Sequence, residues 1–432
     1  MTSWKGTSRD HGSSAQSCGR WRSIALFQPS LWAHISLDFS PELDFDEVNF
    51  DARFALLEAH LGRSAEAPLT VKFQCYSDGD CITRDEEYRA LDILKKHSHR
   101  WQTLEMVGPK PLFTYLGNTF SLLRNLDVYV YPETDEDDVG ALATFASCPR
   151  LQVATVNEGR FGSSSRVLLP DHLRRYKAGN LVMRHLEVLR SASDSLVECV
   201  LHVADDSTPL PSHTPRIPLP DLLRLSVSGA TILDALDTPA LGELYCFRPS
   251  PPLYSFLARQ KTLRKLVVGE MSSADDITQL LHSLSSIPEL GLYVPMEFAS
   301  DFLKALAPSQ GPSPTLLPSL TTLNVGFIPL RDFQVIPAPI DQDLLMQTIE
   351  AQWQTGGLRS VNFYCMRMSP SQELLARMRV LRDQGLKIEL FTSPRDLDRV
   401  MIPRYFDNDD KPYSSQDLWW GIYEAEQQEQ NQ

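Results

Sequence analysis

The sequence predicts an α/β fold, a curved leucine-rich-repeat solenoid, and three observations support this prediction. Leucine contributes 61 of the 432 residues, about 14% of the chain. The pattern L-x-x-L-x-apolar recurs, and the first leucines of its copies are about 26 residues apart on average, inside the range of leucine-rich repeats. Between many copies, apolar residues recur with the spacing of an amphipathic helix. Individual spacings run from 19 to 38 residues, so we expect an irregular array.

Each copy of the pattern is predicted to form a strand whose alternate side chains point to opposite faces. In LTTLNV, Leu323 and Val325 point toward the core, Asn324 points the other way, and Leu320 opens the turn. Stacked repeats bury such leucines against one another, which no single repeat can do alone. The clear copies are at 122–130, 151–156, 196–201, 222–227, 241–246, 263–268, 320–325 and 358–363, with weaker ones at 103–108, 172–178, 289–294 and 386–391.

Four segments between these strands are predicted to be helices because their apolar residues form one stripe. Acidic residues stand in the expected first turns, where they complement the helix dipole. Proline-rich stretches at 205–220 and 307–319 are expected to be loops, and a C-terminal tail is expected from residue 393. The predicted helices are 85–97, 274–286, 341–353 and 370–381.

The charge balance argues against nucleic acid or an anionic membrane surface as a general partner. Lys and Arg number 41 and Asp and Glu number 55, which gives a net charge of −14. Apolar residues make up 42% of the chain, an ordinary fraction for a globular protein. No apolar run approaches the roughly 18 residues that a membrane-spanning helix needs. We therefore predict partners other than nucleic acid and membrane.

The seven cysteines are predicted to be buried free thiols in a reducing compartment, cytoplasmic or nuclear. Their number is odd and none forms a C-x-x-C pair. Several lie in apolar strand-like runs, as Cys246 does in LGELYCF. The first 20 residues are polar and lack the apolar core of a secretory signal.

The N-terminal segment 17–39 reads as a helix, a turn at Pro29 and a strand that would cap the open end of a repeat array. It also resembles the C-terminal half of an F-box in the fungal (basidiomycete-type) F-box/leucine-rich-repeat family, whose pattern is close to C-x-x-W-R-x-I-A-x-x-x-P-x-L-W. Later segments, such as HLEVLRSASDSLVECVL, resemble the same family. The residues that match the motif are Cys18, Trp21, Arg22, Ile24, Ala25, Pro29, Leu31 and Trp32.

The resemblance implies a non-catalytic substrate receptor of an SCF-type ubiquitin ligase, with the SCF adaptor and cullin as partners and a protein substrate. The expected organisation is a disordered stretch 1–16, a partial F-box-like segment 17–39, a repeat solenoid 40–392 and a tail 393–432. A full F-box begins with a leucine–proline element and an amphipathic helix, and residues 1–16 contain neither. We therefore expect weak adaptor binding, and a stand-alone interaction scaffold is the alternative.

The sequence contains no nucleotide-binding, serine-hydrolase, zinc-protease or EF-hand motif, so we predict no enzyme activity, cofactor or metal. Four weaker signals favour ordinary structure over chemistry. His97 and His99 suit a helix end, the acidic run 135–138 suits a solvated helix start, the serines of 161–165 have no evident base, and Cys75 and Cys81 flank a hairpin-like loop.

One positive signal comes from the strand positions that alternate with the buried leucines. In a solenoid, equivalent positions of neighbouring strands stack, so these side chains are predicted to form one concave surface. Tyrosine is favoured in interfaces because it offers apolar area and a hydroxyl. We interpret the surface as a partner-binding face; the alternative is that aromatic residues simply suit a sheet. Its predicted members are Asp127, Tyr129, Asn157, Ser226, Tyr245, Phe247, Tyr293, Asn324, Asn362 and Tyr364.

Overall fold

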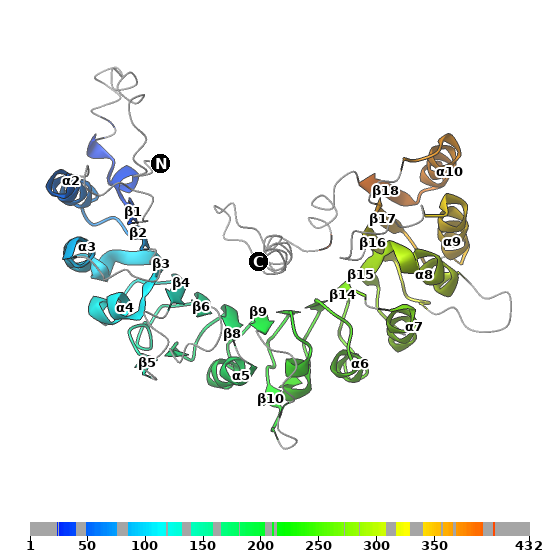
Figure 1. Ribbon diagram of the computed structural model, residues 1–432, viewed down its shortest axis with the longest axis horizontal. Coiled ribbons are helices and arrows are strands. Elements are labelled where there is room, and N and C mark those ends of the chain that lie inside the picture. Colours follow the sequence, from blue (N-terminus) through cyan, green and yellow to red (C-terminus); the bar gives the residue numbers. More distant parts are fainter. Residues whose placement is uncertain are drawn as a thin grey trace, which may run out of the picture. The chain divides into compact units, whose positions relative to one another are not determined.

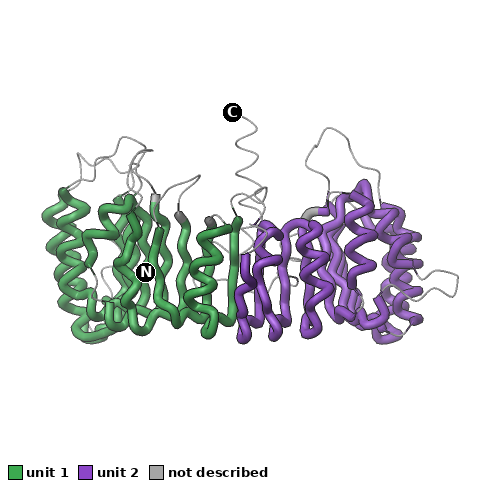
Figure 2. The backbone as a smooth tube through the Cα atoms, turned by 90° about the horizontal axis from the view of Figure 1, so that it is seen from below, with its two compact units in different colours: residues 1–204 green, residues 205–432 purple. Residues whose placement is uncertain are grey.

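The chain is seen in a computed structural model that divides into two compact units, residues 1–204 and 205–432 (Figure 2). The structure describes residues 24, 26–39, 49–75, 85–117, 120–131, 140–158, 166–180, 182–203, 210, 214–271, 273–284, 286–307, 317–328, 340–355, 357–365, 369–391 and 401.

Unit 1 is an α/β unit in which consecutive strands pair in parallel and in chain order. Its paired strands are β1 (His34–Asp38), β2 (Leu69–Gln74), β3 (Trp101–Pro109), β4 (Asn125–Tyr131), β6 (Val153–Glu158), β8 (Arg175–Asn180) and β9 (Glu198–Val203), and β5 (Ala141–Leu142) pairs separately with β7 (Arg166–Val167). Its helices are η2 (Pro29–Trp32), α2 (Phe50–Arg63), α3 (Asp85–Lys95), η4 (Ser98–Arg100), α4 (Lys110–Leu116) and α5 (Val182–Ser191).

Unit 2 repeats this arrangement, and Figure 1 shows its α-helices along one face of its strands. Its paired strands are β11 (Arg224–Val227), β13 (Glu243–Cys246), β14 (Lys265–Glu270), β15 (Glu289–Pro295), β16 (Thr322–Ile328), β17 (Ser360–Cys365) and β18 (Lys387–Phe391), and β10 (Ile217–Pro218) pairs with β12 (Leu236–Asp237). Its helices are η5 (Thr231–Ala235), α6 (Pro251–Leu257), α7 (Ala274–Ser283), η6 (Met296–Phe298), α8 (Ala299–Leu306), α9 (Gln342–Gln354) and α10 (Gln372–Asp383).

The predicted α/β class and the strand positions are confirmed. Every copy of the leucine pattern contains or overlaps a strand, and in the clear copies of unit 2 the first leucine lies two residues before the strand starts. In unit 2 these leading leucines are nearly inaccessible to solvent, as Leu222, Leu241 and Leu320 show. The side chains that follow at alternate positions, such as Leu323 and Val325, are buried as well. Where a helix follows the strand, the core of the repeat therefore lies between the two.

The four predicted helices are also confirmed to within a few residues, and their first turns show why they begin where they do. The Asp341 side chain accepts hydrogen bonds from the amides of Asp343 and Leu344 at the start of α9, each 3.0 Å long. The Ser371 hydroxyl accepts one from Leu374 N at the start of α10. Both are side-chain caps that satisfy amides left without an intrahelical partner.

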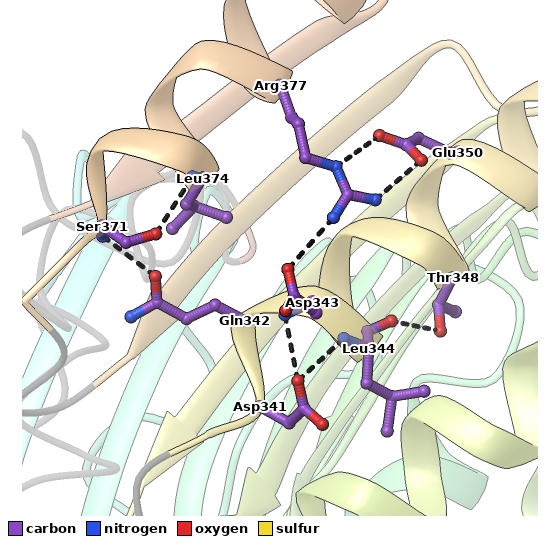
Figure 3. Close-up of polar contacts among 9 residues, drawn as sticks. All are labelled: Asp341, Gln342, Asp343, Leu344, Thr348, Glu350, Ser371, Leu374 and Arg377. Atoms are coloured by element: carbon purple, nitrogen blue, oxygen red, sulfur yellow. Dashed lines mark hydrogen bonds and ion pairs between the residues drawn. The ribbon is translucent and has the colours of Figure 1, made fainter.

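Neighbouring helices of unit 2 are also joined by polar contacts between their outer surfaces (Figure 3). Arg377 of α10 donates from Nε and Nη2 to the two carboxylate oxygens of Glu350 on α9, both at 2.8 Å. Its Nη1 lies 3.3 Å from Asp343. A fork of this kind fixes orientation as well as distance. The same two helices meet again at Gln342, whose Oε1 accepts from Ser371 N.

Removing the α10 cap should measurably weaken unit 2. We expect Ser371→Ala to lower the free energy of unfolding by about 1 kcal/mol, because it leaves Leu374 N without its acceptor. Urea denaturation followed by circular dichroism measures the change. The matched control is Gln372→Ala, an exposed neighbour, for which we expect a change within about 0.5 kcal/mol. Equal effects of the two substitutions would contradict the capping role.

Five of the seven cysteines lie in the described residues, and all five are buried free thiols, as predicted: Cys75, Cys148, Cys199, Cys246 and Cys365. Burial raises the pKa of Cys365 to about 11 and that of Cys148 to about 12. Cys18 and Cys81 fall outside the described residues. Among the described helices, none is both long enough and apolar enough to cross a membrane.

Candidate functional site

The strand face of unit 2, defined as the side of its sheet opposite α6–α10, carries ordered rows of side chains because the strands pair in register. The row nearest the strand starts alternates in charge through Arg224, Glu243, Lys265 and Glu289. Arg224 Nε lies 3.4 Å from Glu243 Oε1, and Lys265 Nζ lies 2.7 Å from Glu289 Oε1. These charges are therefore compensated within the row.

A polar ladder continues from this row toward the end of the sheet. Asn324 on β16 and Asn362 on β17 are register partners, and Asn362 Nδ2 donates to Asn324 Oδ1 at 2.8 Å. Asn324 Nδ2 in turn lies 3.5 Å from Glu289 Oε1. Both asparagines are buried. Asn324 and Asn362 lie on the predicted face and next to each other. Their side chains are hydrogen-bonded to each other and are not exposed to solvent.

The three tyrosines predicted on this face come from strands well separated in the sequence. Tyr245, Tyr293 and Tyr364 lie on β13, β15 and β17, and they belong to one apolar cluster with Val267 and Met401. Ile328 and Phe391 pack against its edge. The predicted convergence of the tyrosines is therefore confirmed.

Their predicted exposure was wrong for two of the three. Tyr245 is 0% exposed and Tyr364 is 6% exposed, whereas Tyr293 is half-buried. Tyr245 Oη donates to Glu243 Oε2 at 2.7 Å, and burial together with this bond raises the pKa of Tyr245 well above its usual range. Met401 lies against this face as a member of the same buried cluster, so the predicted surface is an interior at this place. Phe247, also predicted here, is half-buried under Arg248, whose guanidinium carbon is 5.3 Å from the ring centroid.

Ser226 is buried on β11, where it is the register partner of Tyr245. Sequence reasoning missed the residues that shape this cluster most. Val267 and Gly291 occupy the same register row as Tyr245, but neither is a residue type that signals recognition. Met401 lies more than a hundred positions beyond Gly291 in the chain, in a region that carries no leucine repeat.

The remaining predicted face residues belong to unit 1 and form a smaller group on its strands. Tyr129 on β4 and Asn157 on β6 are register partners, and Asp127 precedes them on β4. Tyr129 is 38% exposed, as a contact residue would be. Asn157 Oδ1 lies beside Gly179 on β8, which is the register partner of His202 on β9.

His202 is the most perturbed titratable group of this unit 1 surface. Both of its ring nitrogens are buried without a hydrogen-bond partner within the described residues. Burial, reinforced by the nearby charge of Lys177 and by His185, lowers the pKa of His202 to about 3. The imidazole of His202 is therefore neutral in the folded unit at neutral pH.

This shift makes stability depend on pH. Above about pH 6.5 the ring is neutral in both states, whereas between about 6.5 and 3 only the unfolded chain takes up the proton. We expect each pH unit lost in that window to remove up to about 1.4 kcal/mol of unfolding free energy. Chemical denaturation from pH 7 to pH 5 should show this slope in the wild type and a smaller one in His202→Gln. Equal slopes in the two proteins would contradict the assignment.

The N-terminal motif is only partly within the described residues. Cys18, Trp21, Arg22 and Ala25 fall outside them. Pro29 begins the short η2 helix, Trp32 ends it, and β1 follows as predicted. The rings of Trp32 and His60 meet edge to face, with 4.8 Å between their centroids. The guanidinium carbon of Arg63 lies 4.6 Å from the centroid of the Trp32 ring. Trp32 is half-buried.

Several apolar side chains next to this motif are exposed. Phe27 is 83% exposed and Leu31 is 63% exposed. Ile24 and Leu26 are exposed as well. Apolar side chains gathered in one short segment are a feature of contact surfaces.

Of the four weaker signals, only His97, His99 and Cys75 lie within the described residues. His97 and His99 lie at and just after the end of α3, around η4, and among the described residues no three His, Cys, Asp or Glu side chains form a cluster that could hold a metal ion. Cys75 Sγ donates to Glu87 at 3.2 Å, inside the core. Cys81 and the stretches 135–138 and 161–165 fall outside the described residues. No family model and no curated protein matches the chain.

Proposed function

We propose that the chain is a leucine-rich-repeat solenoid that binds a protein partner on its strand side, and that it serves as the non-catalytic substrate-recognition subunit of an SCF-type ubiquitin ligase. The observation that carries the binding role is the strand face of unit 2, where tyrosines from three separate repeats converge with apolar residues at one place. Tyrosine-rich apolar clusters with charged and amide side chains around them have the composition of protein interfaces.

The repeat architecture supports this proposal. A leucine-rich-repeat array requires consecutive parallel strands with a period of about 26 residues. It also requires that the segments between the strands lie on one side of the sheet. In such an array the strand side is the surface on which equivalent positions of many repeats add up. A partner would therefore contact several strands at once.

The ligase association rests on the F-box resemblance and on the apolar side chains beside it. Phe27 and Leu31 expose large apolar surfaces within the motif segment, as an adaptor-binding segment would. Ubiquitin transfer itself would belong to partner proteins. The second candidate is a stand-alone scaffold that binds a protein partner without any ligase.

We expect weak binding to the purified SCF adaptor, with a dissociation constant above about 1 μM, because losing part of a small interface can remove most of its affinity. Isothermal titration calorimetry measures it. The double variant Phe27→Asp, Leu31→Asp should abolish the interaction, while Leu223→Asp, an exposed leucine of unit 2, should leave it unchanged. A sub-micromolar constant would contradict the expectation, and no binding by the wild type would favour the scaffold.

A further inference from the structure

The apolar cluster on the strand face of unit 2 contains a notch that is filled by one side chain from the C-terminal region. Its walls are Tyr245, Val267 and Tyr364, and its floor is Gly291. A Cβ atom on Gly291 would lie 3.5 Å from Met401 Cγ and 3.0 Å from Val267 Cγ2. Met401 therefore packs at ordinary contact distance over Gly291, whose tightest neighbour is Val267, and Met401 is 0% exposed there. We call this space the Met401 notch.

Met401 fills the apolar part of the notch but leaves a polar group beside it unsatisfied. Tyr293 packs against the cluster, and its hydroxyl is buried with no hydrogen-bond partner in the described part of the chain. Buried hydroxyl groups of tyrosine normally find a partner. The polar side chains of the two rows beside it, Lys265, Glu289, Asn324 and Asn362, are already paired with one another. The notch is therefore complementary to an apolar side chain together with a nearby polar group, and Met401 supplies only the first.

That the notch is filled by a methionine, Met401, also indicates a contact that another side chain can replace. Methionine is unbranched and flexible, so it enters an irregular space without close shape matching. A segment of the same chain acts at a high effective concentration, so it can occupy a site for which a separate ligand has the better contacts.

We propose that the Met401 notch is a recognition site for a peptide segment of the protein partner, one that inserts an unbranched apolar side chain and offers a hydrogen-bonding group to the Tyr293 hydroxyl. Met401 holds the site until the partner replaces it. This inference rests on the proposed binding role of the strand face and specifies what that face recognises.

The test uses the full chain and a fluorescent peptide with the sequence of residues 396–406, DLDRVMIPRYF, as the probe. Fluorescence anisotropy measures its affinity for the wild type and for Met401→Ser, in which the internal competitor is removed. We expect the peptide to bind Met401→Ser at least about tenfold more tightly, which corresponds to about 1.4 kcal/mol. A peptide with leucine in place of its methionine should bind comparably, whereas one with serine should lose at least about tenfold.

Two further variants in the Met401→Ser background separate recognition from folding. Gly291→Val fills the floor of the notch and should abolish peptide binding, with thermal melting confirming that the protein is folded. Tyr293→Phe should leave the melting temperature unchanged or raise it, and should leave the affinity of this peptide unchanged, because the native segment offers the hydroxyl no partner.

Equal binding of the methionine and serine peptides would overturn the inference and reduce Met401 to a purely intramolecular contact. Equal affinity of the wild type and Met401→Ser for the peptide would overturn it as well. Neither peptide measurement depends on a cellular partner. A negative peptide result would therefore overturn the notch without deciding the proposed function, which is tested by adaptor binding and by crosslinking to a co-purified partner.

Discussion

Trp101→Ala is expected to lower the free energy of unfolding of unit 1 by about 3–5 kcal/mol. Trp101 begins β3, is 0% exposed and is among the largest fully buried side chains of the described residues. Its ring lies 5.4 Å from that of Phe120, which in turn lies 5.7 Å from Phe145. Removing the indole therefore leaves a cavity bordered by rigid rings from neighbouring repeats. Denaturant unfolding of the full chain, followed by tryptophan fluorescence and circular dichroism, measures the loss.

Two matched substitutions test whether burial is the reason. Trp101→Phe keeps an aromatic ring and removes an indole N–H that is buried without a partner in the described chain, so we expect a cost below about 1.5 kcal/mol. Trp32→Ala removes a half-buried ring whose contacts are His60 and Arg63, and we expect about 1 kcal/mol. Equal losses at positions 32 and 101 would contradict this account.

The second large effect is expected at Tyr245. Tyr245→Ser should lower the free energy of unfolding by about 3 kcal/mol, because it removes a fully buried ring and leaves Glu243 without its hydroxyl donor. Tyr245→Phe keeps the ring and removes only that hydrogen bond, so a cost of about 1 kcal/mol is expected.

The control for this prediction is Tyr129→Ser on the strand surface of unit 1, where the side chain is 38% exposed. A change within about 0.5 kcal/mol is expected there. If Tyr245→Ser were as mild as Tyr129→Ser, the ring at 245 would be a surface group and the buried cluster with Met401 would not exist in solution. The melting midpoints of the three variants decide between these outcomes.

The strand positions could be predicted from the sequence because each repeat contains its own evidence. The first leucine, the second leucine and the following apolar residue all enter the same local core, as Leu320, Leu323 and Val325 do. Such short-range patterns predict local structure wherever burial is decided within one repeat. The helices at 341–353 and 370–381 were predictable for the same reason, and their capping residues Asp341 and Ser371 stand directly before them.

Some elements were missed because they lack the leucine spacing. The strand β2, LTVKFQ, buries Leu69, Val71 and Phe73 by simple alternation, without the L-x-x-L pattern. The helix α2 begins at an Asn49 cap and buries Phe54 and Leu57. The cap and the apolar spacing are both visible in the sequence, but this segment contains no leucine-repeat pattern.

The state of the candidate site could not be read from the sequence because it depends on a contact between distant segments. Alternation correctly predicted that Tyr245, Tyr293 and Tyr364 share one face. It could not say what covers that face, since Met401 lies far along the chain and in no repeat. Gly291 illustrates the same limit, because the absence of a side chain matters only once a neighbour fills the space.

Site-specific photocrosslinking tests the central claim, that a protein partner binds the strand face of unit 2, most directly. An azidophenylalanine replacing Tyr293 keeps the ring and places the reactive group on that face. The same amino acid at Val380, which is 54% exposed on α10, reports on the helix side. We predict that a partner co-purified with the full chain is crosslinked from position 293, more strongly in the Met401→Ser variant, and not from position 380. Crosslinking from position 380 alone would contradict the account.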